Sequence, residues 1–280
     1  MKIADWLHSS TLFLTRHDIP TARLDCLVLL ADALEEDKAY VLARPELELT
    51  DVQVAQLKKQ LIQRSQHIPL AYIRGRTEFY GREFSINKHV LEPRPESETM
   101  IEQALTLLSS LPGANVIDIG TGSGALAITV KLEAPRANVH AVDIDPNCLD
   151  VAKQNASLHR ADISFCQGDL FAPFSAKILA NTVVLANLPY VPETHTINQA
   201  AANEPKLAIF GGTDGLDLYR TMFAQFQKAE SLPAAVLTES LPFQHQSLER
   251  IAADNGYRLE NTSDFIQVFT PSSQKVQLQA

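Results

Sequence analysis

The stretch NVIDIGTGSGALAITV, residues 115–130, decides the fold of this chain. A short apolar run leads into three closely spaced glycines and then into residues that favour a helix. The stretch therefore predicts a strand, a tight turn and a helix, in that order. Gly120, Gly122 and Gly124 would let the backbone approach a ligand without a clash from a Cβ atom. The helix that follows presents amide N–H groups and the positive end of its dipole. We therefore expect a nucleotide-like cofactor at this loop.

Alternating strands and helices follow this stretch. Further strands are predicted over 138–145, 162–169, 182–187 and 234–240. Helices are predicted over 147–159, 216–226 and 242–256, and a last pair of strands within 257–270. Such alternation is typical of an α/β fold, in which helices cover both faces of a mostly parallel sheet. The tail 272–280 is expected to be frayed.

The N-terminal part lacks this alternation and carries apolar residues at helical spacing, with helix starts expected at Pro20 and after the cap Thr50. We expect a helical domain over 1–75. TEFYGREFSIN, 77–87, alternates around Gly81 and predicts a β-hairpin, so 76–90 is assigned as a linker. The main domain is then expected over 91–280.

Composition narrows the class of protein. The chain has 280 residues, 45% of them hydrophobic and 20% charged, and no stretch approaches the roughly 18–20 apolar residues that span a bilayer. Its first ten residues lack the apolar core of a signal peptide, and its three cysteines are widely separated. We expect free thiols, no metal site, no membrane association and a cytoplasmic location.

The net charge of −9 argues against a generic nucleic-acid binder, and no stable nucleic-acid binding is expected. The segment 58–94 is nevertheless locally basic, with eight lysines and arginines against three glutamates. Two interpretations stay open for it. It is either an ordinary solvated surface or a face that meets an acidic partner or RNA.

Polar residues end several of the predicted strands. Asp143 ends the second strand, about 20 residues beyond the loop, where a ribose-binding carboxylate is expected in nucleotide-binding folds. Asp169 and Asn187 end the third and fourth strands, so all three should meet the glycine loop in one crevice. Taken by itself, the loop also fits a relaxed dinucleotide-binding pattern, and a strand-end Asp is often a helix cap, as expected for Asp145.

Asn187-Leu188-Pro189-Tyr190 follows the fourth strand directly. Asn187 offers a carbonyl acceptor and an amide donor, and Pro189 favours an extended Leu188 whose carbonyl points outward. Tyr190 would add a flat wall. Two acceptors and an aromatic plate suit a planar –NH2 group, whose attack on an electrophile would depend on positioning and on electrostatic stabilisation of the charge that develops on the nitrogen. Asn187 and Tyr190 are therefore the predicted catalytic residues, with a plain turn as the alternative.

These motifs together resemble class-I S-adenosylmethionine-dependent methyltransferases and, more closely, the HemK/PrmC family, the glutamine methyltransferases of peptide chain release factors. The resemblance spans most of the chain and rests on PLAYIRGRTEFYG (69–81), LEPRPESE (91–98), DIGTGSGALAI (118–128), AVDID (141–145), NLPYVP (187–192) and EPKLAIFGGTDGLDLYR (204–220). It implies a Rossmann-like, mostly parallel, seven-stranded sheet preceded by an N-terminal helical domain.

The resemblance also implies S-adenosyl-L-methionine as cofactor and S-adenosyl-L-homocysteine as product. The implied cofactor-binding residues are Gly120, Thr121, Gly122, Ser123 and Gly124 for the methionine part, Asp143 for the ribose, Asp169 and Leu170 beside the adenine, and Asn187. The implied substrate-binding residues are Asn187, Leu188, Pro189 and Tyr190, with Leu91 and Arg94 near the entrance. The implied partner is a class-1 release factor, whose Gly-Gly-Gln tip would enter the site while the helical domain helps to dock it. A monomer is expected.

Three departures from the family pattern leave alternatives open. Leu188 stands where the family typically has Pro, DFIQVFTPSSQ lacks the usual Arg, and LTESLPFQHQ differs from the usual acidic-glycine pattern. The contact expected from position 188 is its backbone carbonyl, which Leu supplies as well as Pro. One alternative acceptor is a glutamine in a ribosomal protein. Another is the N6 amino group of an adenine in nucleic acid, because Asn-Leu-Pro-Tyr also occurs in RNA adenine dimethyltransferases. A non-enzymatic cofactor-binding module is the third alternative.

Overall fold

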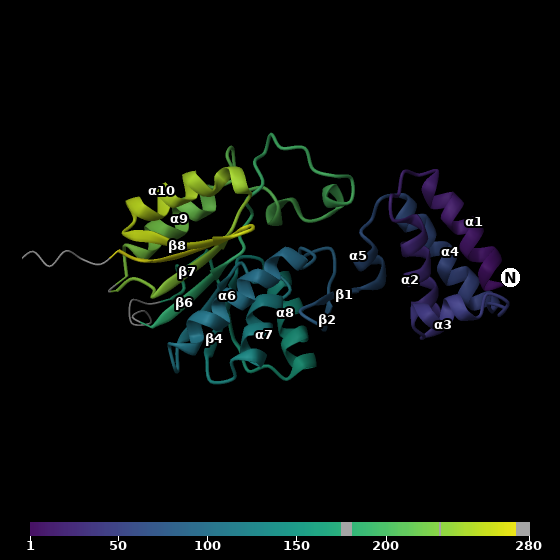
Figure 1. The fold of residues 1–280 in the computed structure, drawn as a ribbon, viewed down its shortest axis with the longest axis horizontal. Helices are drawn as coiled ribbons and strands as arrows, with labels where there is room; N and C mark the ends of the chain where they lie inside the picture. The colour runs from purple at the N-terminus through teal and green to yellow at the C-terminus, as the bar shows by residue number, and fades with distance from the viewer. Residues whose placement is uncertain (175–180, 230, 273–280) are drawn as a thin grey trace, which may run out of the picture. The chain divides into compact units, whose positions relative to one another are not determined.

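A computed structural model describes residues 1–174, 181–229 and 231–272, so that the predicted frayed tail lies outside the described residues except for Ser272. The chain divides into two compact units (Figure 1). The first consists of residues Met1–Gly75 together with Ile197–Asn203, and the second of Arg76–Thr196 together with Glu204–Ala280. The hairpin predicted as a linker therefore belongs to the second unit, and the proposed domain functions stay predictions.

The described residues of the first unit form five α-helices: α1 Ile3–Thr15, α2 Ala22–Leu34, α3 Lys38–Ala43, α4 Asp51–Ser65 and α5 Leu70–Arg74. Apolar side chains from α1 to α4, including Trp6, Leu30 and Leu57, make one buried core. The predicted cap of α4 is confirmed, because the Thr50 hydroxyl accepts the Gln53 N–H at 3.3 Å. The second helix begins at Ala22 instead of Pro20, with Thr21 as its cap residue.

The arginines of the basic segment 58–94 are paired with carboxylates. Arg64 forms a buried ion pair with Asp25 at 2.7 Å inside the first unit. The other pairs are Arg74 with Asp32, Arg76 with Glu83, Arg82 with Glu133, and Arg94 with Glu92 and Glu204. Because these arginines already have acidic partners, they are less available to bind phosphates, and both interpretations of the segment stay predictions.

The second unit contains a seven-stranded sheet in the order β5-β4-β3-β6-β7-β9-β8 among its described residues. Its strands are β3 Asn115–Ile119, β4 Asn138–Asp143, β5 Ser164–Gln167, β6 Thr182–Ala186, β7 Ala235–Glu239, β8 Tyr257–Ser263 and β9 Ile266–Pro271. The strands β5, β4, β3, β6 and β7 pair in parallel, and β9 is antiparallel to both of its neighbours. The predicted mostly parallel, seven-stranded sheet is confirmed.

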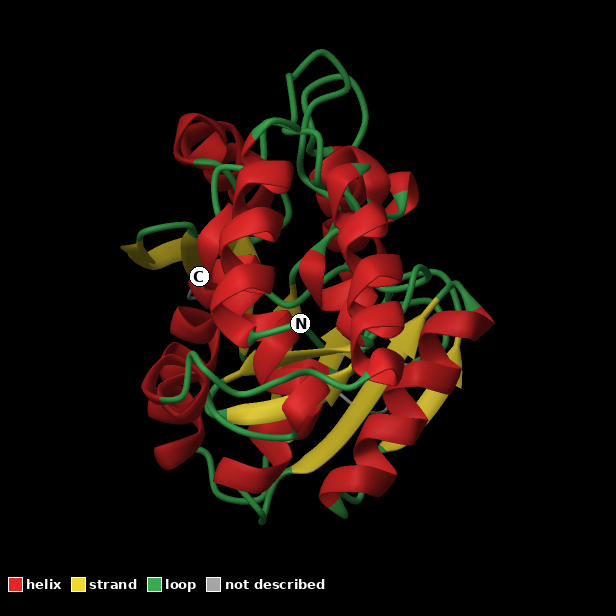
Figure 2. Cartoon of the chain, turned by 90° about the vertical axis from the view of Figure 1, so that its right-hand side faces the viewer, coloured by secondary structure: helices red, strands yellow, loops and turns green. Residues whose placement is uncertain are grey.

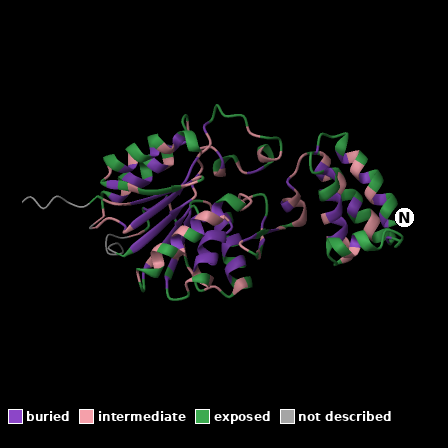
Figure 3. Cartoon of the chain, in the orientation of Figure 1, coloured by how far each residue is buried: buried purple, intermediate pink, exposed green. Residues whose placement is uncertain are grey.

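Helices cover both faces of this sheet (Figures 1 and 2). On one face lie α6 Glu98–Ser109, α7 Ala125–Glu133 and α8 Pro146–His159, and on the other α9 Asp217–Phe226 and α10 His245–Asp254. Alternate strand residues belong to different cores. Val116 and Val183 pack with the first set of helices, and Ile117 and Val184 with the second. Figure 3 shows that the central strands are largely buried. A strand that is buried on both faces has a continuous run of apolar residues in the sequence, and such runs made these strands predictable.

The topology sets the position of a binding site. From β3 the chain winds through β4 to β5 on one side and then returns to β6 on the other side of β3. Open α/β sheets bind ligands beyond the carboxyl ends of their strands at such a reversal point. The glycine loop follows β3, and Asn187 follows β6. The structure therefore brings the two motifs that were singled out from the sequence to the same edge.

The predicted hairpin is formed by β1 Arg76–Phe79 and β2 Arg82–Ser85. Tyr80 and Gly81 in its turn both have positive φ, which suits the twist of a two-residue hairpin. Phe79 and Phe84 are buried in the core that contains α6 to α8.

All three cysteines lie in the described part of the chain and are free, with Cys26 and Cys148 buried and Cys166 half-buried. Among the described helices, none has the length and apolar character needed to cross a bilayer.

Candidate active site

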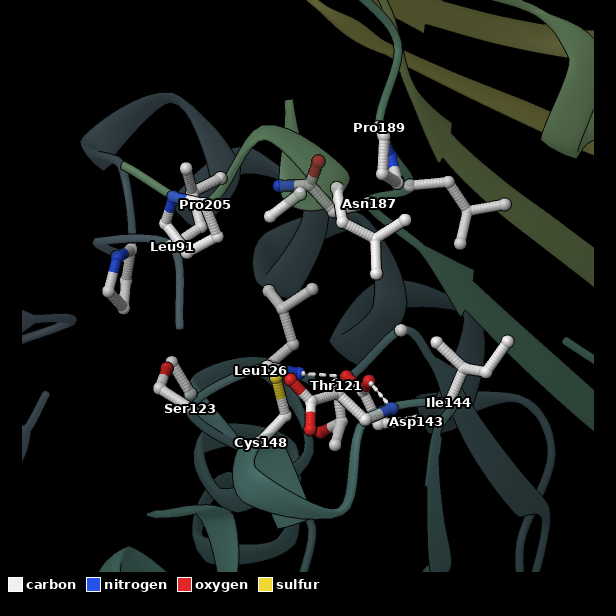
Figure 4. Close-up of a pocket in the computed structure, with 18 of the residues that line it drawn as sticks. Leu91, Thr121, Ser123, Leu126, Asp143, Ile144, Cys148, Asn187, Pro189 and Pro205 are labelled. Atoms are coloured by element: carbon white, nitrogen blue, oxygen red, sulfur yellow. Dashed lines mark hydrogen bonds between the residues drawn. The ribbon is translucent and has the colours of Figure 1, made fainter. Parts of the chain in front are cut away.

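A cavity of about 230 Å³ opens at the carboxyl ends of β3, β4 and β6 (Figure 4). In Figure 4 the side chains of Asn187 and Pro189 lie on one side of it, and those of Ser123 and Asp143 on the opposite side. The predicted residues that line it are Leu91, Arg94, Gly120, Thr121, Gly122, Ser123, Asp143, Asp169, Leu170, Asn187, Leu188 and Pro189. Gly124 and Tyr190 are not among the described residues that line it.

The three loop glycines all adopt positive φ, but for different purposes. The N–H groups of Gly120 and Thr121 both donate to the Val142 carbonyl, at 2.9 and 3.0 Å, so the loop folds over the end of β4. Gly124 lies one step deeper. A Cβ atom there would lie 3.0 Å from Ile128 Cδ1 and 3.1 Å from Ala152 Cβ. Gly124 therefore serves the close packing of α7 on α8, while Gly120 and Gly122 line the cavity.

Asp143 connects the end of β4 to the glycine loop. Its Oδ2 accepts the Gly122 N–H at 2.9 Å, and its Oδ1 accepts the Asp145 N–H at 3.0 Å. Burial raises the pKa of this carboxyl, and the two backbone N–H donors oppose that shift. A carboxylate oxygen can accept two hydrogen bonds, so Asp143 can still accept one from a ligand hydroxyl. Asp145 caps α8 through Asn147, as predicted.

Two buried polar side chains that were not singled out from the sequence support the loop. Asp118 Oδ2 accepts the Thr121 hydroxyl at 2.6 Å, and burial raises the pKa of Asp118 to about 7. Asn155 on α8 donates to the carbonyls of Ser123 and Ser85, each at 2.9 Å, and accepts the Ser85 N–H at 2.8 Å. The hairpin and the glycine loop are thus held by the same amide.

A second group of polar side chains surrounds Asn187. Its Nδ2 donates to Ser97 Oγ at 2.9 Å and to Glu239 Oε2 at 3.0 Å. Ser97 Oγ also donates to Glu239 Oε2, at 2.6 Å, and Tyr190 Oη donates to Glu239 Oε1, at 3.0 Å. Burial raises the pKa of Glu239, and its hydrogen bonds from Ser97, Tyr190 and Asn187 oppose that shift. Burial beside Glu239 likewise raises the pKa of Tyr190.

Leu188 contributes more than the backbone carbonyl that was expected from it. Its side chain is buried, and a Cβ atom on Gly120 would lie 3.1 Å from Leu188 Cδ2, so this side chain packs directly on the glycine loop. Its N–H donates to Tyr219 Oη at 3.3 Å. The same hydroxyl lies 2.5 Å from the Glu239 carbonyl oxygen, which connects the ends of β6 and β7.

The predicted entrance residues Leu91 and Arg94 both line the cavity. Arg94 Nη2 lies 2.6 Å from Glu204 Oε1, so the segments PRPESE and EPKLAIF are joined at the cavity by an ion pair. Burial raises the pKa of Glu204, and the Arg94 guanidinium opposes that shift. No group of three His, Cys, Asp or Glu side chains placed to hold a metal ion occurs within 1–174, 181–229 and 231–272.

Comparison with known proteins adds family information to this geometry. Residues 5–75 match the family model of the PrmC N-terminal domain, and residues 98–204 match that of the methyltransferase small domain. The chain is 38% identical to a release factor glutamine methyltransferase of Koribacter versatilis over 74% of this chain and 75% of that protein. The protein of the same name from Deinococcus radiodurans is 31% identical over 94% of this chain and 95% of its own length.

Solved structures support the fold. The crystal structure of the hMettl16 catalytic domain in complex with MAT2A 3'UTR hairpin 6 superposes with a TM-score of 0.52 at 14% identity. The match covers 81% of this chain and 84% of that one. At this level of identity the likeness concerns the arrangement of helices and strands.

Proposed function

The chain belongs to the family of release factor glutamine methyltransferases, and from this premise we propose that it methylates the side-chain amide nitrogen of the glutamine in the Gly-Gly-Gln motif of class-1 peptide chain release factors. The methyl donor is S-adenosyl-L-methionine, and the product is S-adenosyl-L-homocysteine. The observation that carries the proposal is that the glycine loop and Asn187 line the same cavity, so the proposed cofactor-binding loop and the proposed binder of a planar –NH2 group are close together.

The cavity suits this cofactor. When bound, S-adenosyl-L-methionine supplies an electrophilic methyl group on a sulfonium centre. Residues 120–123 would hold its methionine part, because a Cβ atom on Gly122 meets no protein atom within 4 Å and leaves the backbone open to a ligand. The Asp143 carboxylate would accept the ribose hydroxyls. Asp169 and Leu170, on the same lining, would lie beside the adenine. Gly124 is proposed to act through helix packing instead of contact.

Two alanine substitutions in the loop should separate packing from binding. Gly124→Ala should lower the free energy of unfolding by roughly 2–4 kcal/mol, because the backbone there is left-handed and the added Cβ atom would be crowded. Gly122→Ala should cost only about 1–2 kcal/mol, for the left-handed backbone, yet weaken cofactor binding by about tenfold. Urea unfolding and calorimetric titration measure the two effects. Equal losses of stability in both variants would contradict the assignment of Gly124 to packing.

The substrate amide would be held by acceptors. With both N–H groups of Asn187 donated to Glu239 and Ser97, its Oδ1 is the atom that remains to accept from a substrate N–H. The Leu188 carbonyl is proposed as the second acceptor. Carbonyl dipoles fixed in this way orient the nitrogen and stabilise the positive charge that develops on it during methyl transfer. Tyr190 is proposed to act beside the cavity through its bond to Glu239.

The charges at the cavity favour a protein acceptor over a nucleic acid. Four carboxylates, those of Glu92, Asp143, Asp145 and Asp169, line it together with one arginine. That arginine, Arg94, is ion-paired with Glu204 and Glu92. Nucleic-acid sites use unneutralised cations to bind phosphates, so an acidic lining disfavours RNA or DNA. It accepts a neutral Gly-Gly-Gln tip without a comparable penalty.

Residues 5–75 of the first unit match the PrmC N-terminal domain, which supports a role in docking the release factor. The enzyme is proposed to act as a monomer in the cytoplasm. We propose the domain functions as predicted: docking for residues 1–75, a connecting hairpin for 76–90 and catalysis for 91–280.

Competition between acceptors tests the proposed class of substrate. The purified protein is given labelled S-adenosyl-L-methionine with a recombinant class-1 release factor, a ribosomal protein fraction and RNA in one mixture. We expect the label in the release factor. Label in RNA would establish the adenine alternative, and label in a ribosomal protein the second glutamine alternative. Tight cofactor binding with no label in any acceptor would establish the non-enzymatic alternative.

A further inference from the structure

Glu239 is a buried carboxylate that receives donors from separate segments of the second unit. It ends β7 and is 1% exposed. Its three donors are Ser97, in the 3-10 turn before α6, and Asn187 and Tyr190, in the loop after β6. Neither the family comparison nor the sequence motifs assign this residue a role. A buried carboxylate is costly unless it is fully hydrogen-bonded, so an arrangement with three donors calls for an explanation.

The arrangement determines which way the Asn187 amide faces. An ionised carboxylate only accepts hydrogen bonds, so the group of Asn187 that faces Glu239 must be the –NH2 group. The Ser97 hydroxyl gives its one proton to Glu239 at 2.6 Å, which leaves its oxygen to accept the second N–H of Asn187 at 2.9 Å. Rotating the amide by half a turn would place its Oδ1 against the Glu239 oxygen and lose both bonds.

We propose that Glu239 is a positioning residue that, with Ser97, holds the Asn187 amide in the one orientation that offers Oδ1 to the substrate amide. The inference rests on the proposed methyl transfer and adds a residue to it. No described residue donates a hydrogen bond to Asn187 Oδ1, and Asn187 lines the cavity. Glu239 does not line it, so its effect passes through Asn187.

Two substitutions at position 239 give the first part of the test. Glu239→Ala removes the acceptor, frees the amide to turn, and should lower kcat for methyl transfer by about 10- to 100-fold, a loss that corresponds to about 1.4–2.7 kcal/mol. The dissociation constant for S-adenosyl-L-methionine should stay within threefold. Glu239→Gln keeps an acceptor for Ser97 and Asn187 and can donate to Tyr190 Oη, so it should restore kcat to within about fivefold of the native value.

A double-mutant cycle gives the second part. If Glu239 acts through Asn187, Glu239→Ala should lower kcat no further in a chain that already carries Asn187→Ala. A structural role would lower kcat by the same factor in both backgrounds. Thr238→Val is the matched control, because Thr238 is the adjacent, fully buried residue of β7 and its hydroxyl has no partner among the described residues. It should leave kcat unchanged.

The outcomes separate this inference from the proposed function. If the native protein transfers no methyl group to a release factor, the proposed function fails and the inference fails with it. If the native protein is active but the two losses multiply, or Glu239→Gln is as impaired as Glu239→Ala, the inference alone is overturned. Should Glu239→Ala not fold, Ser97→Ala serves instead, with a several-fold loss of kcat expected in the native background and none in the Asn187→Ala background.

Discussion

Asn187→Ala should lower kcat for methyl transfer to a release factor by at least about 100-fold, the loss typical of removing one preorganised hydrogen-bonding group from a site of charge development. The substitution deletes the Oδ1 acceptor and leaves Glu239 without one of its three donors. Binding of S-adenosyl-L-methionine should change by no more than a few-fold, because the glycine loop and Asp143 remain in place. Single-turnover transfer of labelled methyl and calorimetric titration measure the two quantities.

The control for this substitution is Asn261→Ala, which makes the same change on an exposed residue of β8 and should leave both quantities unaltered. Equal losses of kcat and of cofactor affinity in Asn187→Ala would mean that Asn187 holds the cofactor and not the substrate amide. That result would contradict the assignment of the acceptor role, while the assignment of the cavity as the cofactor site would stand.

Asp143→Ala should produce the opposite pattern. Its carboxylate accepts the N–H groups of Gly122 and Asp145 and is proposed to accept the ribose hydroxyls. Hydrogen bonds to a charged group contribute about 1.5–3 kcal/mol, so the dissociation constant for S-adenosyl-L-methionine should rise by roughly 10- to 150-fold. At saturating cofactor, kcat should stay within a few-fold, because the acceptors for the substrate amide are unchanged.

Asp150→Ala on α8 removes the same charge from an exposed position and should leave the cofactor affinity as it is. If Asp143→Ala binds the cofactor as tightly as the native protein, the carboxylate serves the loop alone, and the ribose has another partner. If both substitutions weaken binding equally, the effect is one of net charge and not of a specific contact.

Much of the fold follows from local sequence. Strands such as β6 and β7 are buried on both faces and therefore read as unbroken apolar runs. The positions of the glycine loop and Asn187 then follow from topology, because the carboxyl ends of neighbouring parallel strands meet at one edge. The cavity brings together twelve of the fourteen residues that the sequence singled out. The start of α2 was misplaced by two residues because Pro20 lies before the cap residue instead of after it.

The residue roles that the sequence did not predict depend on contacts between segments that are far apart along the chain. Glu239 lies within a predicted strand and ends β7, but its role comes from Ser97 and Asn187, which are far away along the chain and meet it only in the folded sheet. The signal that was available is a carboxylate at the carboxyl end of a central strand. Asn155 is similar, because its partners are backbone groups of the hairpin and the glycine loop.

Leu188 shows the same limit. The contact expected from this position was its backbone carbonyl, which Leu supplies as well as Pro. The folded chain buries the side chain against Gly120 and uses the N–H as a donor to Tyr219, a group that proline lacks. The packing between the two motifs is a property of the sheet edge where they meet, and local spacing does not reveal it.

The measurement that tests the central claim most directly is mass spectrometry of a class-1 release factor after incubation with this protein and S-adenosyl-L-methionine. We predict a mass increase of one methyl group, located by fragmentation on the glutamine of the Gly-Gly-Gln motif. It should be absent when that glutamine is replaced and strongly reduced with Asn187→Ala. Methylation that persists on the release factor after the glutamine is replaced would contradict the account.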